Sequence, residues 1–158
     1  MPITNQEFRN ALATFASGVT VVTAAAADGK LYGLTVSAFC SVSLDPPLVL
    51  ICIEKTARCH EAFKESGKIV VNVLAEDQRH VSERFATQMD DKFEGIEYSL
   101  NDAGTPVLEG AATVLECAVR ESLDGGDHTI FILEVEDTEV GISRPLLYYG
   151  GNYRTLGA

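Results

Sequence analysis

The sequence has few basic residues and no long hydrophobic run. Lys and Arg total 12 against 23 Asp and Glu, which gives a formal net charge of −11. Such a charge repels phosphate backbones and anionic membrane surfaces, so we expect neither a nucleic-acid partner nor a membrane partner. No stretch approaches the roughly 20 apolar residues of a membrane span, and residues 1–15 lack the basic start and apolar run of a signal peptide. We therefore expect a soluble, cytoplasmic protein.

Several motifs of enzyme chemistry are also absent. The four cysteines form no C-x-x-C pair, and no His lies at a zinc-ligand spacing from them. The sequence has no Ser-His-Asp order, no cluster of metal ligands and no phosphate-binding G-x-x-x-x-G-K-[ST] motif. These absences predict reduced cysteines packed as small hydrophobic residues, no catalytic cysteine and no bound metal.

The chain has 158 residues and 46% hydrophobic content, which suits one domain over residues 1–158 with a core of its own. Residues 4–7 have the form of a capping box, and Phe8, Leu12 and Phe15 follow at helical spacing. We expect an N-terminal helix whose apolar stripe faces the core and which ends before Gly18.

Strand patterns dominate the rest of the chain. Residues 19–23 and 31–39 flank an Asp-Gly turn and predict a hairpin. Residues 48–53 are apolar on both faces, so this strand should be covered on both sides. Residues 115–120 and 131–136 alternate with a period of two, as half-buried antiparallel strands do.

Short helices and one long excursion complete the expected fold. A helix over residues 57–66 capped by Thr56 precedes a strand at 68–74, and a second short helix covers residues 77–86. Residues 87–110 are polar and read as a long surface excursion. The fold class expected is mainly β with short helices, closed into a barrel that removes exposed edges.

Four segments carry candidate binding chemistry. Residues 35–43 contain four hydroxyl residues and a small Ala at the end of an expected strand. They can leave backbone groups open to a flat heteroaromatic ring, although an ordinary Ser/Thr-rich strand end has the same composition. Residues 55–58 place two cations at an expected helix start. Such a segment can bind a phosphate, although a capped helix with solvated basic side chains has the same pattern. His128 comes just after two glycines. It can contact a ligand there, or it can be a hydrogen-bonded structural residue of a turn. Residues 148–154 combine aromatics with Arg154, which fits ring stacking or a terminal strand at an interface.

Taken together, these segments resemble the short-chain flavin reductase family, the reductase partners of two-component flavin-dependent monooxygenases. The resemblance runs nearly end to end and is carried by Phe15-Ala16-Ser17-Gly18-Val19-Thr20-Val21-Val22-Thr23, Gly33-Leu34-Thr35-Val36-Ser37-Ala38-Phe39, Ser41-Val42-Ser43-Leu44-Asp45-Pro46-Pro47, Asn72-Val73-Leu74, Phe85-Ala86, Gly126-Asp127-His128, Pro145-Leu146-Leu147-Tyr148 and Tyr153-Arg154. It implies the FMN-binding split β-barrel and a homodimer.

The resemblance also implies an NAD(P)H-dependent flavin reductase that passes reduced flavin to a partner monooxygenase. The flavin-binding residues it implies are Thr35, Val36, Ser37 and Ala38 along the isoalloxazine, Ser41 near the ribityl-phosphate, Lys55, Thr56, Ala57 and Arg58 at the phosphate, and Phe85 beside the ring. His128, as the catalytic residue, and the pair Tyr153 and Arg154 would meet the nicotinamide nucleotide.

Two choices stay open from the sequence. Relatives often have Asn in place of Glu54 and serines in place of Ala57 and Arg58, which leaves FMN and FAD both possible. The pair Gly150-Gly151 stands where relatives often have a basic residue, which leaves NADH and NADPH both possible. The alternative function is a split-barrel protein that retains its flavin, either as a self-contained oxidoreductase or as a binder without turnover.

Overall fold

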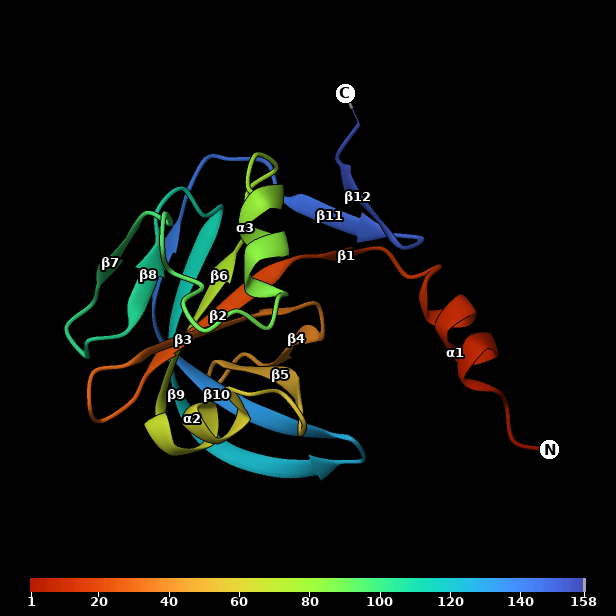
Figure 1. Cartoon of the computed structure of the whole chain (residues 1–158), viewed down its shortest axis with the longest axis horizontal. Coiled ribbons are helices and arrows are strands. Elements are labelled where there is room, and N and C mark those ends of the chain that lie inside the picture. The colour runs from red at the N-terminus through yellow and green to blue at the C-terminus, as the bar shows by residue number, and fades with distance from the viewer. Residues whose placement is uncertain (158) are drawn as a thin grey trace.

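A seven-stranded antiparallel sheet, in the order β3-β2-β6-β9-β10-β5-β4, forms the body of the computed structural model, which describes residues 1–157 (Figure 1). A small sheet, β1-β11-β12, lies at the C-terminal end, and β7 pairs with β8. The elements are α1 (Asn5–Leu12), β1 (Ser17–Gly18), β2 (Thr20–Ala25), β3 (Leu31–Val36), β4 (Phe39–Ser43), β5 (Leu48–Glu54), α2 (His60–Ser66), β6 (Lys68–Val73), α3 (Arg79–Phe85), β7 (Tyr98–Leu100), β8 (Pro106–Leu108), β9 (Thr113–Gly125), β10 (His128–Val140), β11 (Leu146–Tyr149) and β12 (Asn152–Thr155). This confirms the expectation of a mainly β fold with short helices.

The two edge strands of the main sheet are neighbours in the sequence. Strand β3 lies at one edge and β4 at the other, and only Ser37 and Ala38 separate them. The amide of Cys52 in β5 donates to the carbonyl of Ala38 at 3.1 Å. The sheet must therefore curl until its two edges meet at residues 37–38.

A hydrophobic core lies against each face of the curled sheet. Successive residues of β2 point to opposite faces, and accordingly Val22 joins an inner core with Phe63 of α2. Val21 joins an outer core with Phe85 of α3 and Leu108 of β8. The two helices thus seal the sheet from opposite sides, and no helix of residues 1–157 has both the length and the apolar character needed to cross a membrane.

The predicted hairpin over residues 19–39 is confirmed as β2 and β3. Lys30 donates its amide to the Asp28 carboxylate at 2.9 Å, and Gly29 has φ of 88°, a backbone angle that glycine adopts without a steric penalty. The strand ends at Val36, two residues before the chain enters β4.

The predicted N-terminal helix is present, but its stripe does not face the core. Thr4 and Glu7 form the capping box, with a distance of 2.7 Å from the Thr4 amide to Glu7 Oε2. Phe8, Leu12 and Phe15 are 53, 54 and 76% exposed. Figure 1 shows the reason, because α1 projects away from the curled sheet, and none of its residues is buried.

The second predicted helix begins three residues later than expected. The amide of Ala57 donates to the Glu54 carbonyl, and the amide of His60 donates to the Ala57 carbonyl, both at 3.0 Å. These two tight turns keep residues 55–59 out of α2, and Thr56 does not cap it. The helix predicted at residues 77–86 is confirmed as α3.

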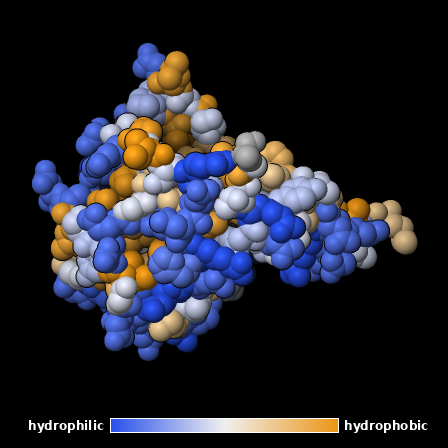
Figure 2. Space-filling view, turned by 90° about the horizontal axis from the view of Figure 1, so that it is seen from above, coloured by the Kyte–Doolittle hydropathy of each residue, from blue (hydrophilic) through white to orange (hydrophobic). Residues whose placement is uncertain are grey.

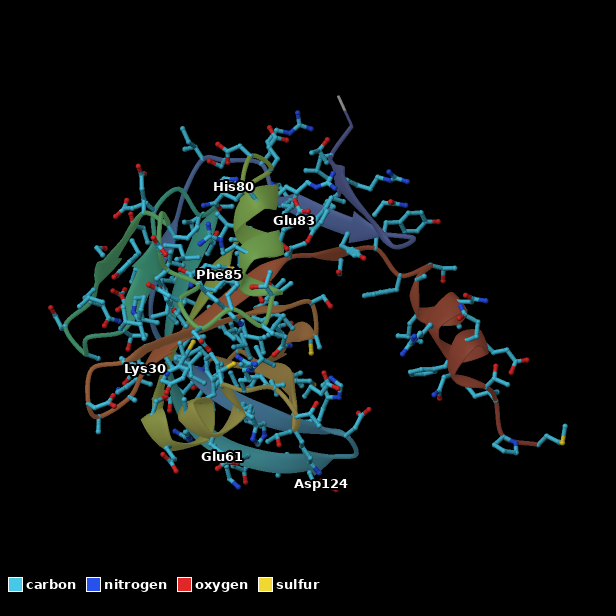
Figure 3. All side chains as sticks on the ribbon, in the orientation of Figure 1. Lys30, Glu61, His80, Glu83, Phe85 and Asp124 are labelled. Carbon is cyan, nitrogen blue, oxygen red and sulfur yellow. The ribbon has the colours of Figure 1, made fainter. Side chains whose placement is uncertain are left out.

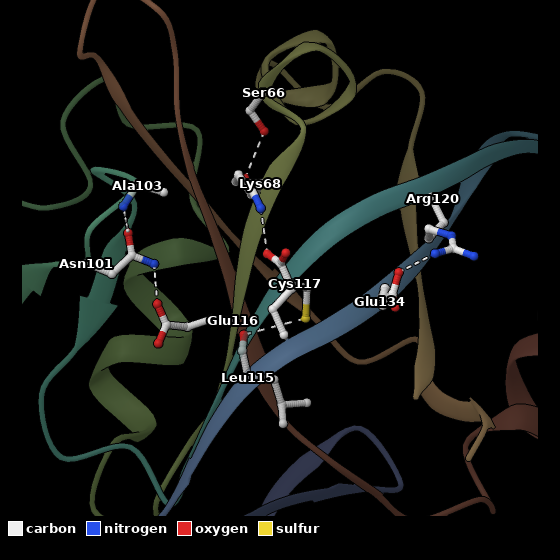
Figure 4. A network of polar contacts seen from close by, with 10 residues as sticks. Ser66, Lys68, Asn101, Ala103, Leu115, Glu116, Cys117, Arg120 and Glu134 are labelled. Atoms are coloured by element: carbon white, nitrogen blue, oxygen red, sulfur yellow. Dashed lines mark hydrogen bonds and ion pairs between the residues drawn. The ribbon is translucent and has the colours of Figure 1, made fainter. Parts of the chain in front are cut away.

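Residues 87–110 are more firmly anchored than a surface excursion. Phe93 and Leu108 are buried in the outer core, and β7 and β8 form a hairpin. Asn101 donates its side-chain amide to Glu116 of β9 at 2.5 Å, a contact drawn in Figure 4. The excursion therefore covers the outer face of the sheet, a role that its polar composition does not predict.

The expectation that β5 is covered on both faces is wrong in part. Val49, Ile51 and Ile53 are buried in or beside the inner core, whereas Leu50 and Cys52 on the opposite face are half-buried. Thus one face of β5 stays partly open, and this open face lies next to the two residues that join the edges of the sheet.

Candidate active site

A groove of about 290 Å³ lies where the edges of the main sheet meet. Its lining is drawn from β3 and the residues after it, from β5 and the following turn, from the segment after α3 and from the start of β10. Seven predicted site residues line it, namely Thr35, Val36, Ser37, Ala38, Thr56, Ala57 and His128. The curl of the sheet therefore brings together three of the four segments that the sequence singled out.

The backbone of residues 37–38 offers hydrogen-bond donors to this groove. Both residues are exposed, and within residues 1–157 neither amide N–H has a hydrogen-bond partner. The carbonyls of Ser37 and Ala38 are occupied, by the amides of Phe39 and Cys52. Two neighbouring open N–H groups fit the acceptor atoms at the edge of a flat heteroaromatic ring.

The side chain of Thr35 stabilises the fold around the groove. Its hydroxyl donates to the carbonyl of Ser82 in α3 at 2.6 Å. The Ser82 hydroxyl in turn lies 2.7 Å from the Tyr153 hydroxyl in β12. A chain of polar contacts therefore joins the groove wall, α3 and the C-terminal hairpin, and it fixes the position of the wall.

His128 begins β10 and lies directly opposite Glu54 of β5 in the strand register. Both residues line the groove. His128 Nδ1 lies 2.7 Å from Asp127 Oδ1, and this hydrogen bond holds the pKa of the Asp127 carboxyl below its ordinary value. The imidazole is half-buried, and one of its nitrogens already has a carboxylate partner. It can therefore be held in a fixed orientation toward a bound ring.

The predicted phosphate-binding segment, Lys55 to Arg58, lies on a turn and not at a helix start, so the helix dipole does not reach it. The Lys55 ammonium pairs with the carboxylate of Asp124. Arg58 donates to the Gln88 carbonyl at 2.9 Å and to Asp90 at 3.1 Å. Both cations are thus near the groove, and each already has an acceptor within the chain.

A second cavity, of about 160 Å³, adjoins the groove through the shared residues Leu34, Ala57 and Gln88. Arg58 and Lys92 both line it. Lys92 donates to the carbonyls of Gly33 and Phe85 at 3.1 and 3.2 Å, and burial lowers its pKa. No sequence pattern pointed to Lys92, because its contacts depend on the packing of residues 87–93 over β3.

Besides Lys55 and Arg58, four predicted site residues lie outside the groove. Ser41 is exposed on β4. Phe85 is fully buried in the outer core and so offers no face to a ligand. Tyr153 lies between the ring of Tyr148, 5.2 Å away, and the guanidinium of Arg79, 4.9 Å away. Its neighbour Arg154 is exposed on β12.

A larger, apolar groove of about 730 Å³ meets the first at Ser37 and Ala38, which line both. Its other walls are α1 with Phe15, the open face of β5 at Leu50, and residues 148–151 of the β11–β12 hairpin. The face seen in Figure 2 is otherwise largely hydrophilic, with separate hydrophobic patches.

Sequence reasoning missed several residues of the first groove, among them Cys52, Glu54 and Gln88. Alternation along β5 places Cys52 and Glu54 on the same face as Leu50, so the sequence pattern could have shown that these two residues share a face. Their position opposite His128 depends on strand register, which the sequence did not reveal.

Comparison with known proteins places the chain in a family. The model of the flavin reductase like domain matches residues 12–157, and the chain belongs to this family. It is 41% identical over 152 residues to the reductase component of a 4-nitrophenol 4-monooxygenase/4-nitrocatechol 2-monooxygenase from Rhodococcus opacus, covering 96% of this chain and 81% of that protein. It is 42% identical over 149 residues to the FMN reductase (NADH) SmoA of Agrobacterium fabrum (strain C58), covering 94% and 84%.

A solved structure agrees over the same range. The NADH:FAD oxidoreductase SgcE6 of Streptomyces globisporus C-1027, in complex with NAD and FAD fragments, superposes with a TM-score of 0.92 at 34% identity, covering 98% of its chain and 99% of this one. Some relatives are longer, and the chain spans 47% of one that is 41% identical to it.

Proposed function

We propose that this protein is an NAD(P)H-dependent flavin reductase that reduces FMN or FAD and supplies reduced flavin to a partner monooxygenase. The observation that carries the proposal is the pair of open amide N–H groups at Ser37 and Ala38, in a groove that also contains His128. The family match and the names of the relatives support the same activity.

The chain itself needs to supply little chemistry for this reaction. The flavin provides the hydride acceptor, and the protein must hold the two rings in contact with the correct faces together. Residues 35–38 would position the isoalloxazine through their backbone, and Phe85 would support this wall from behind. His128 would orient the nicotinamide or supply a proton near the reduced ring.

The remaining predicted residues have supporting roles in the proposal. Thr56, Ala57 and the two neighbouring cations would hold the flavin phosphate, with Ser41 near the ribityl chain. Tyr153 and Arg154 would contact the nicotinamide nucleotide from the C-terminal hairpin. The solved relative in complex with NAD and FAD fragments supports the binding of both kinds of nucleotide by this chain.

The proposal includes a homodimer of single-domain split barrels located in the cytoplasm. A groove of about 290 Å³ lies at the lower limit of ligand pockets, which supports completion by a second copy. The exposed residues Phe8, Leu12 and Phe15 of the N-terminal arm, with Val42 in β4 and Leu44 just after it, provide an apolar surface for the second copy.

The test is anaerobic oxidation of NADH and NADPH at 340 nm with excess FMN, FAD or riboflavin. We expect rapid oxidation that depends on added flavin. The six rates would decide which flavin the protein prefers and whether it prefers NADH or NADPH. Oxidation without added flavin would indicate a retained cofactor, and no oxidation with any flavin would reject the reductase function.

His128→Ala sharpens this test. We expect turnover to fall roughly 10- to 100-fold while the flavin dissociation constant stays the same, because the residue acts on the nicotinamide side. The matched control is His80→Ala, an exposed histidine of α3 that does not line the groove. Unchanged turnover in His128→Ala would remove this residue from the mechanism.

A further inference from the structure

Lys55, one of the two cations at the proposed phosphate position, is already neutralised by an acid from another part of the chain. Asp124 lies at the far end of the β9–β10 hairpin, where Figure 3 labels it. Its carboxylate pairs with the Lys55 ammonium, and this hydrogen bond lowers the pKa of Asp124. The side chains are 78 and 42% exposed, so a soluble anion can reach the pair.

Among residues 1–157, no other acid near this hairpin tip forms an ion pair with Lys55. The Asp127 carboxylate is bonded to His128, although its backbone carbonyl accepts the Lys55 amide at 2.9 Å. Glu121 is exposed and has no ion pair among residues 1–157. Asp124 is therefore the one acid of the tip whose carboxylate occupies Lys55.

We propose that Asp124 is an internal competitor of the flavin phosphate for Lys55 and thereby weakens the binding of phosphorylated flavins. This inference rests on the proposed function. A phosphate dianion attracts an ammonium more strongly than a carboxylate does, so it can displace Asp124. The displaced carboxylate stays close and repels the phosphate, which lowers the net gain.

The competition explains how a protein with two cations at its proposed phosphate position can still release reduced flavin. Riboflavin has no phosphate, so its binding leaves the Lys55–Asp124 pair intact. FMN must break the pair before it gains Lys55. Asp124 therefore acts only on flavins that carry phosphate, and this selectivity distinguishes it from an acid that merely adds to the net charge.

The experiment measures dissociation constants of FMN and riboflavin for the full chain and for Asp124→Asn by fluorescence titration at low salt. We expect FMN to bind about 3- to 10-fold more tightly to the variant, the range set by an exposed ion pair and the repulsion it leaves. Riboflavin binding should change by less than about 1.5-fold, because that ligand has no charge for Asp124 to act on. The gain for FMN should shrink at high salt.

Two further variants separate a local effect from a general one. Glu121→Gln removes the same charge from the same hairpin and should leave FMN affinity nearly unchanged. Lys55→Met should weaken FMN binding, and in that background Asp124→Asn should tighten it less than it does beside Lys55, because only the repulsion remains to be removed. Equal tightening by Glu121→Gln, or no tightening by Asp124→Asn, would overturn the inference.

The outcomes also separate this inference from the proposed function. If the protein binds and reduces flavins but Asp124→Asn leaves FMN affinity unchanged, only the competitor role is rejected. If the unaltered chain binds neither FMN nor riboflavin, both the reductase function and the competitor role are rejected.

Discussion

Helices α1 and α3 have the same apolar spacing and opposite surroundings. Each has about two turns and places two apolar residues four positions apart, Phe8 and Leu12 in α1, Val81 and Phe85 in α3. Both residues of the α3 pair are buried, whereas those of α1 are about half exposed. The apolar spacing therefore predicts a helix in both places and does not predict what the helix packs against.

The difference comes from the position of each helix relative to the curled sheet. The chain reaches α3 between β6 and the excursion that covers the outer face, so the helix is enclosed on several sides. Helix α1 precedes the first strand and extends away from the body. We infer that α3 stabilises the subunit and that α1 stabilises the proposed dimer.

The largest effect is expected from Phe85→Ala. The ring is fully buried, and a Cβ built at Gly33 would lie 2.4 Å from it, which shows how closely β3 and α3 approach. Removing the ring should lower the free energy of unfolding by about 3–5 kcal/mol in urea denaturation. Phe85→Leu keeps most of the apolar volume and should lose less than half as much. A loss below about 1 kcal/mol for Phe85→Ala would contradict the role given to α3.

A smaller and different effect is expected from Leu12→Ser in α1. This residue is exposed and lines the apolar groove, so the unfolding free energy of the monomer should change by less than about 0.5 kcal/mol. The dimer should dissociate at least about tenfold more readily, measured by sedimentation velocity over a range of concentrations. The control Asn10→Ser alters an exposed polar residue of the same helix. A monomer at every concentration in the unaltered protein would contradict this account of α1.

The sequence predicted the features that depend on neighbouring residues. The hairpin at Asp28-Gly29, the capping box of α1 and the alternation of β9 and β10 are local signals, and each appears in the structure. The groove wall at residues 35–38 was predicted because small and hydroxyl residues follow a strand. These signals depend on backbone geometry over a few residues, which tertiary packing did not override.

The features that the sequence missed depend on register and on packing between distant segments. The pairing of His128 with Glu54 requires the alignment of β10 against β5. The burial of Phe85 and the contacts of Lys92 depend on how residues 79–93 lie across β3. Likewise the position of Lys55 suggested a free cation, because the partner that neutralises it lies 69 residues further along the chain.

The smallest effect is expected from Thr4→Ala. Thr4 Oγ1 accepts the Glu7 amide at 3.1 Å, and its own amide donates to the Glu7 carboxylate, so the substitution removes half of the capping box. Amide hydrogen exchange within α1 should accelerate by about 2- to 10-fold, while exchange in α3 and the melting temperature stay the same. A lower melting temperature of the isolated subunit would mean that α1 supports the curled sheet after all. If exchange in α1 slows as protein concentration rises, the second copy and not the cap supplies most of its order, and this would connect the exposed stripe directly to the dimer.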